Sequence, residues 1–376
     1  MINKFSSFKN TLLHNLLNVP GWRTPRKIVV IESDDWGSIR MPSPDVLIGF
    51  QKYGHDFTGS IYNQLDTLER NEDLLKLFEV LSSVRDAAGN YPIITANVVV
   101  GNPDFRRIRE SGFKSYYYEP VTETLQRYPG SSEVISLWKQ GIKERIFYPQ
   151  FHGREHVNVI RWMEALQGGD PGMMFSFDKE TTFSGDGDYN YMEVLDYNTP
   201  SDLHQMKNSL SEGLELFENI FGFRSKSFIP PCYTWSNEIE ETLYQGGVRY
   251  IQGLIVQSVP TGQFGRYKYR YHFLGNKNSI GQYYLIRNSF FEPALSAGRD
   301  IVGDCLKRIN TAFYWKKPAV ICTHRINFMG ALNRENRTNN LKLFKELLYK
   351  ITDRWPDVEF MTSDQLGDII SHSVRN

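Results

Sequence analysis

The stretch KIVVIESDDWG, residues 27–37, decides the fold. Its first part, KIVVIES, is a short continuous run rich in β-branched side chains, which is typical of a strand buried on both faces. Asp34 and Asp35 follow this run directly, and Trp36 and Gly37 continue it into a possible turn. The stretch therefore predicts a strand of a parallel sheet that carries two carboxylates at its end.

Short apolar runs and helical stretches alternate along the rest of the chain. Further strands are expected at 92–100, 147–153, 226–231, 248–253, 318–325 and 358–362. Helical periodicity and capping residues predict helices at 67–86, 131–146, 155–167, 201–222, 236–247, 298–315, 335–355 and 363–372. Strands that are each followed by a helix indicate a parallel α/β architecture, and their even spread favours a barrel over an open sheet.

Two stretches depart from this alternation. Residues 168–200 are rich in glycine and aspartate and are expected to form a long loop. Residues 258–292 contain YKYRYHF and QYYLIRNSFF, which predict extra strands or a β-hairpin. We expect a single domain, 1–376, with a helical extension at 1–26 and these two insertions.

Composition narrows the functional classes. The chain has 376 residues, 40% of them hydrophobic, so it can bury a large core. Its 43 basic and 43 acidic residues cancel and form no charge run, which gives no support to nucleic-acid binding. Three distant cysteines, Cys232, Cys305 and Cys322, argue against a disulfide framework. With no signal peptide and no membrane-spanning run, a soluble cytoplasmic protein is expected; the oligomeric state is not indicated.

Polar residues fall just past several predicted strands. Asp34 and Asp35 follow the first strand, His152 ends another, and His324 ends the strand at 318–325. His156 lies four residues after His152, so a helix there would put both imidazoles on one face. Strand ends of a parallel barrel converge on one mouth, where a carboxylate and two imidazoles form an open site for a catalytic divalent ion such as zinc.

Taken singly, each motif also has a structural interpretation. Asp34-Asp35-Trp36-Gly37 could be a plain turn, and His324 could be a hydrogen-bonded histidine in the interior. The Asp34-Asp35 pair, the His152/His156 pair and His324 all fall at strand ends, and this coincidence favours metal-assisted hydrolysis.

These motifs, in this order, resemble those of the polysaccharide deacetylase family, also called carbohydrate esterase family 4 or NodB-homology. ESDDWG (32–37) is similar to its TFDDG motif, and HGREH (152–156) to its H-[ST]-x-x-H motif. FIPPCYTW (228–235) is similar to its F-R-P-P-Y-G segment, and ICTHR (321–325) to its L-x-H motif. The resemblance covers about residues 27–330.

The resemblance implies a distorted (β/α)7 barrel that hydrolyses acetyl groups on N-acetylated sugars. It implies a divalent metal, zinc or cobalt, held by Asp35, His152 and His156. Asp34 would then be the general base and His324 the general acid, with a backbone N–H near Tyr233 available to the oxyanion. The residues expected to line the sugar site are Trp36, Pro231, Tyr233 and Trp235, with core packing as an equal alternative for the two tryptophans.

The sequence also departs from the family pattern. Ile229 stands where the family has an arginine that orients the catalytic aspartate, and Arg154, Arg224 and Arg325 are the candidates to replace it. The segment 252–262 lacks the acidic residue expected there. Two alternatives stay open: another amide, imide or ester hydrolase on the same barrel, and a non-catalytic carbohydrate-binding relative.

Overall fold

The computed structural model describes residues 14–53, 60–182, 191–296 and 298–373. Its centre is a parallel sheet in the order β10-β7-β6-β5-β2-β1-β12-β11. The strands are β1 (Lys27–Trp36), β2 (Ile94–Val99), β5 (Phe147–Gly153), β6 (Ser227–Phe228), β7 (Tyr250–Gly253), β10 (Tyr283–Ile286), β11 (Ser289–Phe290) and β12 (Ala319–His324).

The sheet closes on itself through one extended segment. β10 and β11 form the two ends of the sheet, yet only Arg287 and Asn288 separate them in sequence. The backbone N–H of Arg287 donates to Gly253 on β7, and that of Asn288 donates to Val320 on β12. Residues 283–290 therefore act as one strand between β7 and β12, and the described residues form a seven-stranded barrel, as the sequence predicted.

The prediction for 258–292 was correct in one part and wrong in another. Strands β8 (Val256–Pro260) and β9 (Tyr267–Tyr271) form the expected antiparallel hairpin. The stretch 283–290, however, is a barrel strand and not part of an insertion. The predicted strand at 358–362 is β13 (Val358–Met361), which pairs only with Lys27–Val30 of β1 and lies off the barrel.

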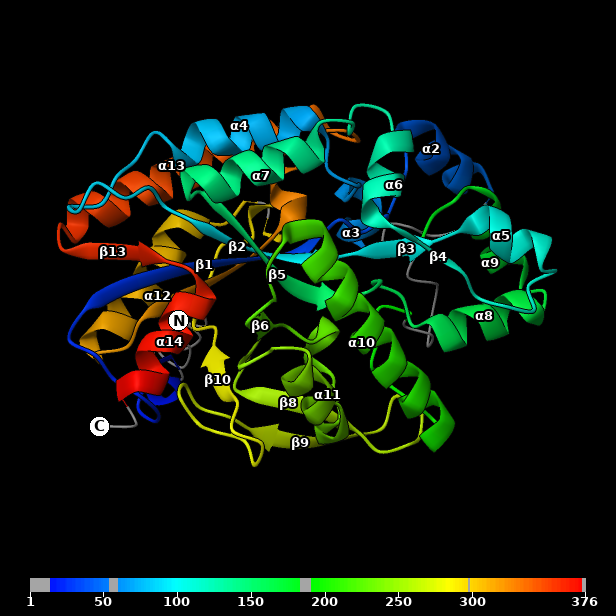
Figure 1. Ribbon diagram of the computed structural model, residues 1–376. Coiled ribbons are helices and arrows are strands. Elements are labelled where there is room, and N and C mark those ends of the chain that lie inside the picture. Colours follow the sequence, from blue (N-terminus) through cyan, green and yellow to red (C-terminus); the bar gives the residue numbers. More distant parts are fainter. Residues whose placement is uncertain (1–13, 54–59, 183–190, 297, 374–376) are drawn as a thin grey trace, which may run out of the picture.

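Helices surround this barrel (Figure 1). Those that follow the barrel strands are α4 (Asn71–Leu81), α7 (Val134–Glu144), α10 (Pro200–Phe221), α11 (Glu240–Gln245), α12 (Ile301–Tyr314) and α13 (Arg334–Arg354), whereas α14 (Ser363–Ser373) follows β13. In Figure 1, α4, α7 and α13 lie along one side of the sheet, whereas α10 and α11 lie on another. Their positions match the predicted helices to within a few residues at most ends.

Alternate residues of β1 explain how the barrel is packed. Val29 and Ile31 belong to the apolar cluster that includes α4, α7, α12 and α13, so they face outward. Ile28 and Val30 point to the other face, into the barrel, and so do the polar residues at the next two alternate positions, Glu32 and Asp34. This alternation carries Asp34 to the interior of the barrel mouth.

Shorter elements are grouped near the strand ends, on the right of Figure 1. They are α2 (Pro44–Tyr53), α3 (Ile61–Leu65), β3 (Gly101–Pro103), α5 (Phe105–Glu110), β4 (Tyr118–Pro120), α6 (Val121–Arg127), α8 (Val159–Gln167) and α9 (Pro171–Asp178). Short 3-10 turns occupy Pro231–Tyr233, Asn237–Ile239, Pro293–Leu295 and Arg325–Phe328. The loop predicted at 168–200 thus contains a helix, α9, while its residues 183–190 lie outside the described part.

The N-terminal extension is described only from His14, and residues 14–17 are helical. Residues 18–26 form turns and irregular structure, so the helix predicted for the extension at 1–26 is wrong there, and residues 1–13 lie outside the described part. Among the described helices, none has the length and apolarity needed to span a membrane.

Candidate metal centre

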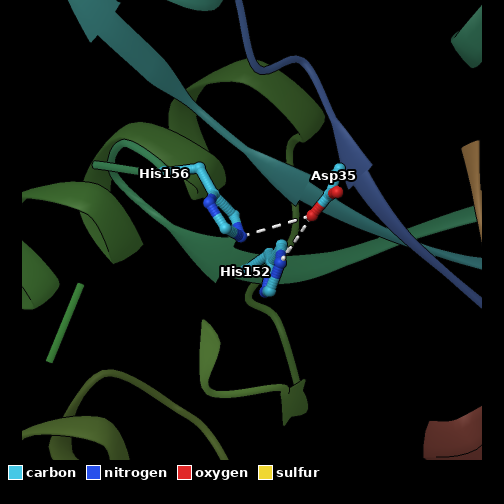
Figure 2. Close-up of side chains that lie close together, drawn as sticks. All are labelled: Asp35, His152 and His156. Atoms are coloured by element: carbon cyan, nitrogen blue, oxygen red, sulfur yellow. Dashed lines mark hydrogen bonds and ion pairs between the residues drawn. The ribbon is translucent and has the colours of Figure 1, made fainter. Parts of the chain in front are cut away.

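Three predicted metal ligands meet at the barrel mouth (Figure 2). The Nε2 atoms of His152 and His156 each lie 3.3 Å from Oδ1 of Asp35. Donor atoms bound at 2.0–2.1 Å to a tetrahedral zinc ion are about 3.3 Å apart, so these distances fit a common ion. The two imidazoles and one carboxylate leave a fourth position for water or substrate, as in catalytic zinc sites.

Local backbone geometry brings the three side chains together. Asp35 has a left-handed φ of 75°, and the pairing of β1 with β2 shifts register between Ser33 and Trp36. Gly37 has a φ of 82°, and a Cβ atom there would lie 2.4 Å from the carbonyl oxygen of Val99. The chain therefore leaves β1 through a bulge and a glycine that no larger residue could replace without movement.

The prediction that His156 lies one turn into a helix was wrong. Helix α8 begins at Val159, and Asn158 caps it by accepting a hydrogen bond from the Arg161 N–H. His156 instead lies in the irregular segment between β5 and α8. Both rings still reach Asp35, because the segment turns back over the mouth and places the two ring centroids 5.0 Å apart.

The protonation states suit metal binding. Burial lowers the pKa of His156 to about 3, so its imidazole is neutral and has a free lone pair. Burial alone would raise the pKa of Asp35, but His156, His152 and Arg40 outweigh it and keep the pKa well below the usual range. Nδ1 of His152 lies 2.8 Å from the Ile229 carbonyl oxygen and donates to it, which leaves Nε2 facing the site.

Asp34 is bound on both carboxylate oxygens by an arginine that the sequence analysis missed. Nη1 and Nη2 of Arg287 each donate to one oxygen of Asp34 at 2.7 Å, and Asn97 Nδ2 donates to Oδ1 at 2.7 Å. Burial would raise the pKa of Asp34, but Arg287 and the nearby histidines lower it to about 2. Asp34 is therefore ionised at neutral pH and held in one orientation.

None of the three arginines proposed from the sequence contacts Asp34. Arg154 pairs with Glu155 and Glu212, Arg224 with Glu218, and Arg325 with Asp66 and Glu69. Arg287 directly follows the apolar run YYLI of 283–286, which is the same strand-end position that led to the other site residues. The same signal points to Arg287 once 283–290 is recognised as a barrel strand and not as part of an insertion.

His324 faces Asp34 across the mouth. Its Nε2 lies 3.6 Å from Asp34 Oδ2, and its Nδ1 lies 2.6 Å from Glu292 Oε1. Burial lowers the pKa of His324, but the charge and hydrogen bond of Glu292, together with Asp34 and Asp35, raise it to about 9. Glu292, just after β11, is therefore the carboxylate partner of His324, and sequence reasoning did not find it.

The residues predicted to line a sugar site have different environments. Trp36 and Trp235 are buried: Trp36 packs edge-on against Phe147 at 5.1 Å, and Trp235 donates from Nε1 to Glu240. The core-packing alternative is therefore the one found for both tryptophans, and they do not line a sugar site: the bulge at Asp35 turns Trp36 outward into the core, and Trp235 packs in the second apolar cluster.

Pro231 and Tyr233 do lie at the mouth. Pro231 lines, with His152, a cavity of about 190 Å³. The Tyr233 hydroxyl accepts a hydrogen bond from Nη1 of Arg287 at 3.1 Å. The Tyr233 backbone N–H was expected to be available to an oxyanion. It donates instead to the Pro230 carbonyl oxygen at 3.0 Å.

Neither a family model nor a curated protein matches this sequence. Solved structures to which the chain is similar include a probable polysaccharide deacetylase from Pseudomonas aeruginosa PAO1, with 11% identity, a TM-score of 0.48 and coverage of 94% of this chain and 92% of the other. A Mycobacterium smegmatis protein named as a polysaccharide deacetylase has 12% identity, a TM-score of 0.46 and 94% coverage of both chains. A pseudoenzyme of family CE4 from Bacillus anthracis has 9% identity, a TM-score of 0.36 and coverage of 89% and 63%.

Proposed function

We propose that the protein is a metal-dependent hydrolase that removes acetyl groups from an N-acetylated sugar or polysaccharide precursor. The observation that carries the proposal is the cluster of Asp35, His152 and His156, whose donor atoms all lie within 4.8 Å of one another. Imidazole and carboxylate are the ligands that zinc takes in catalytic sites, and cobalt accepts the same set. A divalent ion held there would polarise the acetyl carbonyl and acidify a bound water.

Two further residues would carry the protons. Asp34, ionised at neutral pH, takes the proton of the attacking water as general base. His324, protonated at neutral pH, gives its proton to the departing amine as general acid. The pKa of Asp34 is about 2 and that of His324 about 9, and such separated values define acid and base roles in one site.

The arrangement favours catalysis over mere binding of carbohydrate. A binding site has no need for an ionised carboxylate and a protonated imidazole 3.6 Å apart beside a set of metal ligands. Amide, imide and ester hydrolysis by the same residues is the second candidate, because the acid, base and ligands do not distinguish these substrates.

The compartment is part of the same proposal. Cys232, Cys305 and Cys322 are free thiols, which accords with a reducing compartment. We therefore propose that the protein acts in the cytoplasm, on a precursor rather than on finished extracellular polymer.

The test joins metal analysis with acetate release. The purified protein is offered zinc or cobalt, its metal content is measured, and acetate is assayed with N-acetylated saccharides, O-acetylated sugars and simple amides. We expect one ion per chain and release from N-acetylated saccharides. Release from another substrate alone would move the assignment to the second candidate, and a protein that takes up no ion would contradict both.

Variants separate the roles in the same assay. His152→Ala should lose the metal and the activity together. Asp34→Asn should retain the metal and lose turnover by at least about a hundredfold, since it removes the general base. His204→Ala, on the exposed side of α10, is the matched histidine control and should change neither.

A further inference from the structure

A second carboxylate, Glu32, lies on β1 below Asp34 and has no exposed surface. Both face the barrel interior, because they are two residues apart on one strand. Burying a carboxylate costs several kcal/mol unless it is well paired. The two residues before it at alternate positions, Ile28 and Val30, are apolar, so packing alone does not call for an acid here.

Glu32 binds the edge of Arg287 that Asp34 does not use. Nε of Arg287 donates to Glu32 Oε2 at 2.5 Å, while its two Nη atoms donate to Asp34. Ser363, at the start of α14, donates from Oγ to the other oxygen of Glu32 at 2.7 Å. A buried chain of contacts thus runs from the closed end of the barrel through Glu32 and Arg287 to Asp34.

This chain fixes the angle of the guanidinium. An arginine fork binds a carboxylate with two parallel bonds only when its plane is aligned with that carboxylate. Arg287 extends from the extended segment that joins β10 to β11, and Glu32 is the carboxylate that Nε contacts. The Tyr233 hydroxyl and the Cys322 thiol contact Nη1 alone, at 3.1 and 3.2 Å, and do not constrain that edge.

We propose that Glu32 is a positioning residue that holds Arg287 in register with Asp34, so that the Asp34 carboxylate keeps one orientation. This inference deepens the proposed function, on which its relevance to catalysis rests. On this inference, the orientation of Asp34 is determined by a residue inside the barrel and not by a residue at its mouth.

Hydrogen exchange at Arg287 tests this inference in metal-free protein without substrate. Arginine side chains are labelled with ¹⁵N, and the exchange of the Arg287 Nε–H and Nη–H protons with water is measured by NMR. Glu32→Ala should speed the exchange at Nη at least about tenfold, since the fork loses its fixed partner geometry. Glu32→Gln, whose side-chain oxygen still accepts from Nε, should remain close to the wild type.

Asp73→Ala is the matched control, because Asp73 is a buried carboxylate that pairs with another arginine, Arg337, on the outer helices. It should destabilise the protein without altering Arg287. If Glu32→Ala does not fold, Glu32→Met fills the same space without an acceptor and gives the same expectation.

Unchanged Nη exchange in the folded Ala or Met variant would overturn the inference, whatever the activity of the enzyme. Where acetate release is established, Glu32→Ala should also lower kcat about tenfold with KM and bound metal unchanged, and Glu32→Gln should restore most of it. Failure of the proposed function would remove only this second readout, so the two outcomes are distinguishable.

Discussion

Two buried arginines have nearly the same surroundings and very different positions. Arg287 binds Glu32 and Asp34, and Arg325 binds Asp66 and Glu69; neither arginine side chain has any exposed surface. Arg287 lies inside the barrel and ends on the candidate base. Arg325 lies beside β1 and ends on the segment that precedes α4.

The two clusters therefore stabilise different parts of the molecule. Arg325 also donates from Nη2 to the carbonyl oxygen of Ser38, and Glu69 accepts the N–H of Gly37 at 3.0 Å. This cluster fixes the turn that follows the ligand-bearing end of β1. The two clusters have the same chemistry, so their chemistry does not indicate their roles. The difference lies in what each arginine binds: Arg287 binds the candidate base Asp34, and Arg325 binds the segment that precedes α4.

Replacement of Arg287 by methionine should have the largest effect on the reaction. Asp34 would lose its two guanidinium donors and keep the Asn97 donor, and turnover should fall about a thousandfold, or about 4 kcal/mol. Acetate release and metal content are measured for Arg287→Met, Asp34→Asn and the double variant. If the two residues act as a unit, the double variant should be no slower than the slower single one; effects that multiply would show that Arg287 acts elsewhere.

Replacement of Arg325 by methionine should instead have its main effect on stability. It leaves Glu69 buried without a cationic partner and Asp66 with Arg40 as its remaining partner, which should lower the free energy of unfolding by about 3–5 kcal/mol. The midpoint of urea unfolding measures this loss. Turnover of the folded fraction should stay within about threefold of the wild type, and a loss as large as that of Arg287→Met would erase the distinction between the two clusters.

Sequence patterns predicted the candidate metal ligands better than they predicted Arg287. β1, β2, β5 and β12 were predicted because each is a short run rich in apolar residues, and the candidate metal ligands were predicted because they lie at or just past the ends of β1 and β5. Arg287 was missed because it interrupts its own strand: Arg287 and Asn288 split 283–290 into two short pieces. A charged residue within a barrel strand breaks the apolar pattern of that strand, so the sequence indicates a loop there.

Proximity in sequence also led to a wrong candidate for the arginine that orients Asp34. Arg325 is adjacent to His324, yet β12 ends at His324 and Arg325 begins a 3-10 turn, where its side chain pairs with Asp66 and Glu69 and not with Asp34. Trp36 shows the reverse case: it shares the parity of Asp34 but the bulge at Asp35 sends it into the core. Side-chain direction at a strand end depends on such local irregularities, which composition and periodicity do not encode.

The smallest expected effects come from one buried hydroxyl in each cluster. Ser363 donates to the Glu32 carboxylate at 2.7 Å, and Ser131 donates to the backbone carbonyl of Glu69 at 2.8 Å. Each replacement by alanine removes one buried hydrogen bond, so each should lower the free energy of unfolding by about 1 kcal/mol. Only Ser363→Ala loosens the contacts that lead to Asp34, and it should lower turnover about two- to fivefold, or about 0.5–1 kcal/mol. Equal turnover in the two variants, at equal loss of stability, would mean that the interior chain of contacts ends at Arg287 and does not reach the base.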